Sequence, residues 1–318
     1  MPPISGGLPS RHGGPAGASE GWIDMEIQTV GVVGLGNMGL GMAATLARKG
    51  FRVLGYDLSE TRGAPAEAAG VTFVPVLNDV LLRADALVFS LPYARDVEAV
   101  ATAEGGLLTR GDRKVVVIDT STSDPGTTRR LAARLAEAGH ALLDAPVSGG
   151  PSGAAEGTLT MMVGGAEEDY ALARPVLAAM SSRAPHVGPS GAGNIVKLVN
   201  NLLVAAHLVT TGEALRLSEA AGLSAEEAVA VVNTATGRSA ISEVMVPRWV
   251  LSGTFDSGFA AGLMRKDVRL ALELAAESGV DLPLSSHVAQ IWQGSRETIP
   301  DSADFTRMAD YRAGKESL

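Results

Sequence analysis

The feature that most constrains the fold is a glycine pattern, Val32-Val33-Gly34-Leu35-Gly36-Asn37-Met38-Gly39, between an apolar stretch and a helical pattern. The β-branched residues before it predict a buried parallel strand, and the apolar spacing after it predicts a helix. Gly34 allows a tight turn, Gly36 lets the backbone approach a pyrophosphate, and Gly39 lets the helix pack closely on the strand. The amides at the helix start would then receive the phosphate charge.

An acidic residue ends the next expected strand, Phe51–Tyr56: Asp57 stands 18 residues after Gly39. A carboxylate at this place accepts hydrogen bonds from the ribose hydroxyls of an adenosine and repels a 2′-phosphate. Together with the glycine pattern, Asp57 predicts a dinucleotide-binding site, with NAD favoured and NADP possible. The alternative is an ordinary glycine-rich turn beside a surface carboxylate.

The composition of the whole chain excludes several classes of protein. The chain has 318 residues, of which 46% are apolar and 19% charged, so we expect one large or two medium folded domains. A net charge of −9 without a Lys/Arg cluster argues against a nucleic-acid partner. The absence of cysteine excludes disulfides, thiolate catalysis and Cys-based zinc sites. No apolar run reaches the roughly 18–20 residues that span a bilayer, so no membrane partner is expected.

The start of the chain, residues 1–24, is rich in Gly and Pro and lacks the basic and apolar regions of a secretory signal. We therefore expect residues 1–27 to form a disordered tail and the protein to be cytoplasmic. Met25 is an alternative start of translation, shortly before the first strand.

Short apolar stretches alternate with helical patterns from residue 28 to 190, which predicts an α/β domain built on a Rossmann-type doubly wound parallel sheet. The further strands are expected at 86–91, 115–119, 140–144, 158–163 and 184–187. Ligands of such sheets bind beyond the carboxyl ends of the strands. The loops that should therefore share one rim are 34–39, 91–92, 120–122 and 148–150.

After residue 190 the apolar spacing becomes helical, which predicts an all-helical C-terminal domain over 191–298. A long helix over 194–221 would span about 40 Å and could link the two domains. Ser224 and Glu227 form a capping box that opens the next helix. Further helices are expected at 242–251, 262–278 and 284–294. Residues 299–318 are polar and predict a peripheral C-terminal tail.

The long helix carries a polar cluster near its start, Lys197-Leu-Val-Asn200-Asn201. At about 100° per residue, the two asparagines lie within about 60° of Lys197 on the helix surface. A lysine partly desolvated at the rim would have a lowered pKa and could pass a proton to or from a substrate oxygen. Asn201 could orient the lysine or bind the same oxygen. The alternative is a snorkelling lysine with two solvent-facing amides.

A glycine turn, Ser148-Gly149-Gly150, precedes Pro151. Its hydroxyl and free amides could hold a carboxylate, although an ordinary turn would have the same sequence.

The five histidines are not spaced as metal ligands, and we predict no metal site.

Four motifs in order resemble the β-hydroxyacid dehydrogenase family, which includes 3-hydroxyisobutyrate dehydrogenase and tartronate semialdehyde (2-hydroxy-3-oxopropionate) reductase. The motifs are the first glycine pattern, Asp144-Ala-Pro-Val-Ser-Gly-Gly150, Gly191-x-Gly193-x-x-x-Lys197-x-x-Asn-Asn201, and Phe259 with Lys266-Asp267. The resemblance covers residues 28–295. It implies hydride transfer between a nicotinamide and a short β-hydroxy acid or semialdehyde, in a homodimer or homotetramer.

The resemblance also implies roles for single residues. Lys197 would be the catalytic acid/base, assisted by Asn201. The implied substrate-binding residues are Ser148, Gly149 and Gly150 for the carboxylate, with Phe259 and Lys266. The implied cofactor-binding residues are Gly34, Leu35, Gly36, Asn37, Met38, Gly39, Asp57, Leu91, Pro92, Thr122 and Lys266. Asp96 departs from the pattern, since some family members carry an Asn there.

Three alternatives share the cofactor domain. An imine reductase resembles this pattern but generally lacks the lysine at the place of Lys197. A 6-phosphogluconate dehydrogenase has a larger helical portion and a phosphate-binding basic cluster that this chain lacks. A non-catalytic dinucleotide-binding protein would not need Lys197, Asn201 and Lys266. The sequence leaves the identity of the hydroxy acid open.

Overall fold

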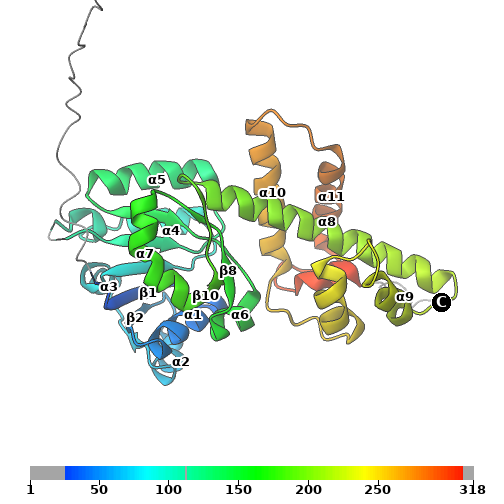
Figure 1. Cartoon of the computed structure of the whole chain (residues 1–318), viewed down its shortest axis with the longest axis horizontal. Coiled ribbons are helices and arrows are strands. Elements are labelled where there is room, and N and C mark those ends of the chain that lie inside the picture. Colours follow the sequence, from blue (N-terminus) through cyan, green and yellow to red (C-terminus); the bar gives the residue numbers. More distant parts are fainter. Residues whose placement is uncertain (1–25, 112, 311–318) are drawn as a thin grey trace, which may run out of the picture.

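The computed structural model describes residues 26–111 and 113–310. An α/β domain and a helical domain stand side by side, and one long helix, α8 (Ala192–Ala220), runs from the first into the second (Figure 1). The expectations for the N-terminal tail, Met25 and the last eight residues fall outside the described residues, except that residues 26 and 27 lead directly into the first strand.

The α/β domain is built on an eight-stranded sheet of order β11-β9-β6-β5-β4-β1-β2-β3. The strands are β1 (Thr29–Val33), β2 (Arg52–Tyr56), β3 (Thr72–Phe73), β4 (Ala86–Phe89), β5 (Val116–Asp119), β6 (Ala141–Asp144), β9 (Val163–Gly164) and β11 (His186–Gly188). Because β1 pairs in parallel with both β2 and β4, the chain order reverses beside β1. Such a reversal is where open α/β sheets bind their ligands.

The large sheet is parallel, as predicted, except that β9 pairs with β6 antiparallel. The expected single strand 158–163 is also divided. Its first part is β8 (Leu159–Met161), which lies between β7 (Val147–Ser148) and β10 (Ser181–Arg183) in a separate three-stranded sheet. An apolar run indicates burial but not the partner of each half, so its spacing could not show this division.

Helices cover both faces of the large sheet, and alternate residues of β1 enter different cores. Val30 and Val32 pack with one set of helices and Val33 with the other. The helices of the α/β domain are α1 (Asn37–Arg48), α2 (Gly63–Ala68), α3 (Leu77–Arg83), α4 (Ala94–Ala101), α5 (Pro125–Glu137), α6 (Gly150–Glu156) and α7 (Glu167–Met180), with 3₁₀ turns η1 (Glu60–Arg62) and η2 (Leu107–Thr109).

The helical domain packs around α8 and the fully buried Trp292. Its other elements are α9 (Ala225–Val232), the π-helix η3 (Ile241–Leu251), α10 (Ala261–Glu277), α11 (Pro283–Gly294), and the 3₁₀ turns η4 (Ser295–Glu297) and η5 (Phe305–Ala309). Ser224 caps α9 as predicted, since the Glu227 amide donates to Ser224 Oγ at 3.2 Å, and the Glu227 carboxylate accepts from the Ser224 hydroxyl at 2.7 Å.

The prediction of a peripheral tail after residue 298 is wrong for η5. Phe305 is 3% exposed and Ala309 is fully buried, and η5 packs against α8. Ala260 and Asp304 form an isolated antiparallel bridge beside the start of α10. Few apolar residues suffice to anchor this segment, so its polar composition was a poor guide to its position.

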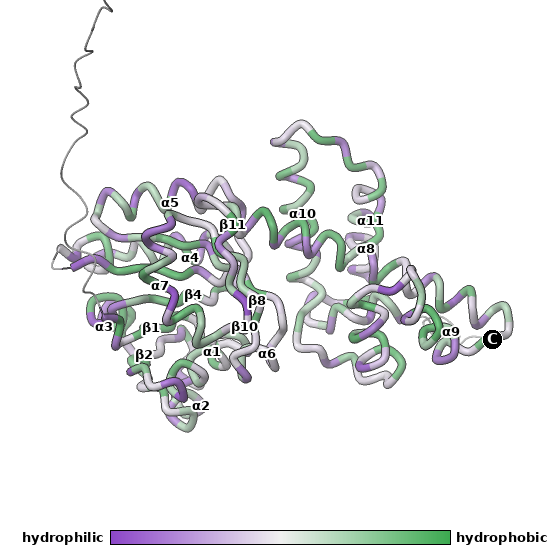
Figure 2. The backbone as a smooth tube through the Cα atoms, viewed as in Figure 1, coloured by the Kyte–Doolittle hydropathy of each residue, from purple (hydrophilic) through white to green (hydrophobic). Residues whose placement is uncertain are grey.

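Among the helices of the described residues, only α8 is long and apolar enough to cross a membrane by length and composition. Figure 2 shows hydrophobic residues recurring along it. The helix contacts α10, α11 and η5 in the helical domain, and β9 and β11 in the α/β domain. Core helices that join domains have the same composition, and this is the role that its contacts give α8.

Candidate active site

The glycine turn after β1 is shaped by close backbone contacts. Gly34 has a φ of +92°, and a Cβ at this position would overlap the carbonyl oxygen of Ser90. A Cβ at Gly39 would overlap the carbonyl oxygen of Gly34, so α1 approaches β1 more closely than any side chain permits. A Cβ at Gly36 would meet nothing within 4 Å, and no side chain of the described residues caps the helix. The open face and free amides fit a dinucleotide phosphate.

Asp57 lies directly beside this turn, at the end of β2. Its Oδ2 accepts a hydrogen bond from the Leu35 amide at 2.7 Å, and its Oδ1 accepts one from the Ser59 amide at 2.8 Å. These contacts fix the orientation of the carboxylate. Because a carboxylate has about four acceptor positions, both oxygens can still receive a ribose hydroxyl.

The loops after β4 and β5 form the next part of the rim. The Leu91 amide donates to Ser121 Oγ at 3.0 Å, which joins the two loops. Lys266 reaches them from α10, and its Nζ donates to the carbonyl oxygens of Pro92 at 3.0 Å and Thr122 at 2.9 Å. The structure therefore brings three predicted cofactor residues, Leu91, Pro92 and Thr122, together with Lys266 across the domain boundary.

The side chain of Lys197 reaches the α/β domain just before the turn Ser148-Gly149-Gly150. Its Nζ donates to the carbonyl oxygen of Val147 at 2.7 Å, one residue before Ser148. Burial lowers the pKa of Lys197, the negative charge of Asp267 raises it again in part, and the positive charge of Lys266 lowers it. The lysine is therefore not a snorkelling surface residue, and a larger share of it is neutral than of an exposed lysine.

Asn201 is held by a partner to which the sequence analysis gave no role. Its Nδ2 donates to Asp267 Oδ2 at 2.5 Å, and its Oδ1 accepts from Asn200 Nδ2 at 3.0 Å. Asp267 is 1% exposed, and its other oxygen lies 3.4 Å from Lys266 Nζ. Asp267 thus links the asparagine to Lys266, and its negative charge also acts on Lys197. Its position beside Lys266 in the fourth motif was the available signal.

The turn Ser148-Gly149-Gly150 lies between β7 and α6. Gly149 has a φ of +131° and Gly150 a φ of +64°, values that favour glycine. The contact between Lys197 and Val147 places the lysine amine beside this turn. The structure therefore joins the second and third motifs into one site.

The carboxylate of Asp144 fixes the start of α8. It is fully buried, and its two oxygens accept hydrogen bonds from the amides of Gly191 at 2.8 Å and Asn194 at 3.0 Å. Burial raises the pKa of Asp144 above its ordinary value, and the hydrogen bonds from these amides offset the rise only in part. A Cβ at Gly193 would overlap the carbonyl oxygen of Met162, so glycine is needed there for α8 to approach the sheet.

Phe259 packs edge-to-face on Phe305 at 5.2 Å between ring centres, within the core of the helical domain. Its predicted contact with substrate stays a prediction.

Asp96 lies in the first turn of α4 and pairs with Arg95 at 3.7 Å. Within residues 26–111 and 113–310, no group of three or more His, Asp or Glu side chains could hold a metal ion.

A cleft of about 310 Å³ opens between the rim and α10. Tyr93 and Thr122 line it from the α/β domain, and Lys266, Arg269 and Leu270 line it from α10. Of the predicted cofactor residues, Thr122 and Lys266 therefore line a space between the two domains.

Asp119, at the end of β5, is a titratable group that the sequence analysis did not select. Burial raises its pKa to about 7, hydrogen bonds from Ser121 lower it, the neighbouring Asp144 raises it, and Lys266 lowers it. Its Oδ1 accepts from the Ser121 amide at 3.0 Å. Ser121 Oγ also accepts a hydrogen bond from the Leu91 amide. Asp119 therefore helps to hold the loops after β4 and β5 through Ser121.

We expect Asp119 to make the folded protein less stable as pH rises from about 4 to about 7, because the folded state retains a proton that the unfolded state releases. In Asp119→Asn this dependence disappears. The free energy of unfolding of the variant, relative to wild type, should therefore rise by up to about 1.4 kcal/mol per pH unit in this window. Denaturant titrations at several pH values measure it, and parallel stability curves for the two proteins would contradict the assignment.

Comparison with known proteins places this arrangement among dehydrogenases. Residues 29–188 match the NAD binding domain of 6-phosphogluconate dehydrogenase, and residues 191–312 match the family described as NAD-binding of NADP-dependent 3-hydroxyisobutyrate dehydrogenase. The chain is 39% identical to 2-(hydroxymethyl)glutarate dehydrogenase of Eubacterium barkeri, over 84% of this chain and 89% of the relative. It is 35% identical to the NAD-dependent L-serine dehydrogenase of Pseudomonas aeruginosa, over 84% and 92%.

Solved structures agree with these matches. The 3-hydroxyisobutyrate dehydrogenase of Mycobacterium tuberculosis with L-serine superposes with a TM-score of 0.82 at 34% identity, over 91% of this chain and all of that one. Imine reductases share the fold at 14–21% identity, which establishes the fold alone.

Proposed function

Because the chain belongs to the β-hydroxyacid dehydrogenase family, we propose that it transfers a hydride between NAD and a short β-hydroxy acid or its semialdehyde, with Lys197 as general acid/base. The single observation that carries this proposal is the contact of Lys197 with Val147. It brings a desolvated amine to the Ser148 turn, at the edge of a domain that binds the nicotinamide cofactor.

Lys197 is suited to the proton half of the reaction. When bound, the cofactor supplies or accepts the hydride. During oxidation the neutral amine of Lys197 takes the proton of the substrate hydroxyl. A hydride leaves the carbon that carries this hydroxyl, so that a C=O double bond forms. In the reverse direction the ammonium returns the proton to the oxygen. A lowered pKa keeps enough amine neutral to act as the base.

The substrate carboxylate would bind at the Ser148 turn. The Ser148 hydroxyl and the amides of Gly149 and Gly150 supply neutral donors, and the left-handed glycine conformations support this arrangement of the backbone. Lys197, which contacts Val147 one residue before Ser148, would then lie near the carbon that carries the hydroxyl. Lys266 would close over cofactor and substrate, because it already joins α10 to the rim.

Asp57 and the glycine turn support a preference for NAD over NADP. The carboxylate stands at the end of β2 with both oxygens oriented, where it would bind ribose hydroxyls and repel a 2′-phosphate. In Asp57→Asn the repulsion is lost but the hydrogen-bonding shape is kept. The ratio of kcat/KM with NAD⁺ to kcat/KM with NADP⁺ should therefore fall in this variant.

The proposal is tested by absorbance at 340 nm with NAD⁺ or NADP⁺ and a panel of hydroxy acids. The panel includes 3-hydroxyisobutyrate, L-serine, D-glycerate, 3-hydroxypropionate and 2-(hydroxymethyl)glutarate, and the reverse reaction is run with the semialdehydes. We expect turnover with at least one acid and a higher kcat/KM with NAD⁺. If NADH binds but neither direction proceeds, the protein is not a β-hydroxyacid dehydrogenase; reduction of imines instead would support the imine reductase alternative.

We propose that the protein is a homodimer or homotetramer joined through α8. Val196, Val199 and Leu203 lie on one side of this helix and are 39%, 51% and 54% exposed, an apolar stripe that a second copy would cover. Leu203→Asp should therefore lower the mass measured by analytical ultracentrifugation, and a monomeric wild-type protein would contradict the proposal. The cytoplasmic location stays a prediction.

A further inference from the structure

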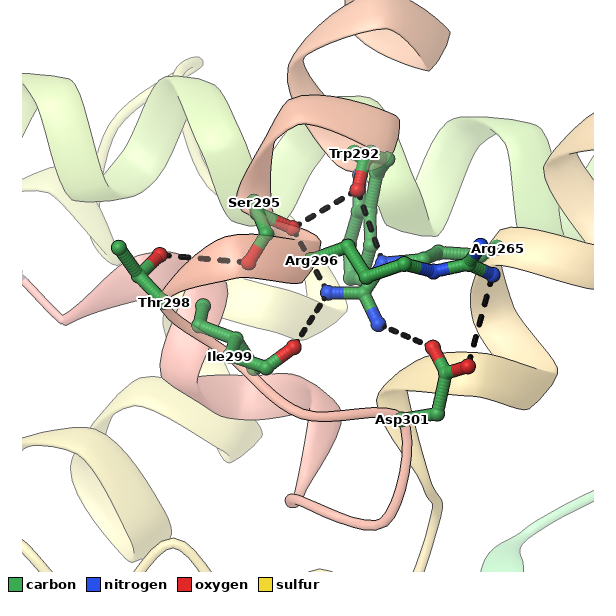
Figure 3. A network of polar contacts seen from close by, with 7 residues as sticks. All are labelled: Arg265, Trp292, Ser295, Arg296, Thr298, Ile299 and Asp301. Carbon is green, nitrogen blue, oxygen red and sulfur yellow. Dashed lines mark hydrogen bonds and ion pairs between the residues drawn. The ribbon is translucent and has the colours of Figure 1, made fainter.

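Arg265 is a buried charged residue that immediately precedes Lys266 and Asp267 on α10. It is 1% exposed, and its side chain lies among residues from the end of α11 and from the segment that follows it (Figure 3). A charge in such a place requires several acceptors, because desolvating a guanidinium without partners costs several kcal/mol. Its contacts therefore indicate what holds this part of α10.

The guanidinium of Arg265 uses all three of its nitrogens. Nε donates to the carbonyl oxygen of Trp292 at 2.9 Å, and Nη1 donates to Asp301 Oδ1 at 2.6 Å. Nη2 donates to Ser295 Oγ at 2.9 Å and to the carbonyl oxygen of Ile299 at 2.8 Å. Four acceptors from residues 292–301 thus surround one planar group, a geometry that a lysine ammonium cannot reproduce.

The same segment also holds the first turn of α10 through the backbone. The Gly262 amide donates to the carbonyl oxygen of Asp301 at 3.0 Å, and the Ala261 amide donates to that of Ala303 at 2.8 Å. A Cβ at Gly262 would lie 2.8 Å from the Cβ of Asp301, so glycine allows this close approach. Asp301 therefore binds α10 with both its backbone and its side chain.

Three successive residues of α10 then reach three different parts of the molecule. Arg265 binds the segment 292–301, Lys266 binds the carbonyl oxygens of the rim, and Asp267 binds Asn201 on α8. Successive helical residues point about 100° apart, so a rotation or shift of α10 changes all three contacts together. The buried guanidinium makes more hydrogen bonds than either neighbour.

We propose that Arg265 is a positioning residue for the dehydrogenase site: by fixing α10 on residues 292–301, it sets the place of Asp267 beside Asn201 and Lys197. The inference rests on the proposed function, because its main readout is the proton transfer assigned to Lys197. Residues 292–301 would then support the active site as well as the core of the helical domain.

The test compares Arg265→Lys and Asp267→Asn, alone and combined, by the pH dependence of kcat/KM. Arg265→Lys keeps the charge but loses the planar group, so Asp267 should shift. We expect a loss of about tenfold to a hundredfold in kcat/KM. The ionisation assigned to Lys197 should move to lower pH in both single variants, because the ammonium form loses the support of Asp267. The double variant should be no worse than Asp267→Asn.

Arg296→Gln is the matched control. Arg296 is exposed and pairs with the outer oxygen of Asp301 at 3.4 Å, so this variant removes a contact of the same carboxylate but leaves the buried guanidinium in place. It should keep the wild-type rate and pH profile.

A lower melting temperature in Arg265→Lys with an unchanged pH profile, and losses that add to those of Asp267→Asn, would show a purely structural role and overturn the inference. If Arg265→Lys does not fold, Asp301→Asn replaces it, because Arg265 then keeps its three uncharged acceptors. A wild-type enzyme inactive on every hydroxy acid would refute the proposed function instead. In that case the pKa of Lys197, measured by NMR with labelled lysine, still tests the inference in the same variants.

Discussion

The hydrogen bonds between the Asp144 carboxylate and the first amides of α8 are the contact on which the rest of the site depends. Asp144 ends β6, and its oxygens receive the amides of Gly191 and Asn194 in a fully buried setting. A negative charge near a helix N-terminus is attracted by the unpaired amides and the helix dipole, by up to about 2 kcal/mol in partly buried settings. Here it also fixes the direction of the helix that carries Lys197 and Asn201, so that the lysine meets Val147.

The electrostatics of the site result from several groups that oppose one another. Burial and Lys266 favour the neutral amine of Lys197, whereas Asp267 favours the ammonium. Asp267 itself is buried between Asn201 and Lys266, where the loss of water is offset by a charged and a neutral partner. This balance leaves a lysine that can exchange a proton. Each charged side chain of the group has a polar or oppositely charged partner, which offsets the cost of its burial.

The local features were predictable from sequence because local chemistry determines them. The glycine turn and the end of β2 at Asp57 follow from backbone requirements within a few residues, whereas the start of α8 is fixed by Asp144, 47 residues before Gly191. The roles of Asp267 and Arg265 could not be predicted in this way, because Asp267 and Asn201 are 66 residues apart and Arg265 and Asp301 are 36 apart. The division of strand 158–163 and the burial of Phe305 and Ala309 also depend on tertiary partners.

Proton transfer by Lys197 is tested most directly by the turnover of Lys197→Ala with the hydroxy acid that the wild-type enzyme oxidises, measured together with the dissociation constant of NADH. We expect a loss of about 10²–10⁴ in kcat, because the proton acceptor is removed, with NADH binding unchanged. Turnover equal to that of wild type would contradict the assignment of Lys197 as the general acid/base.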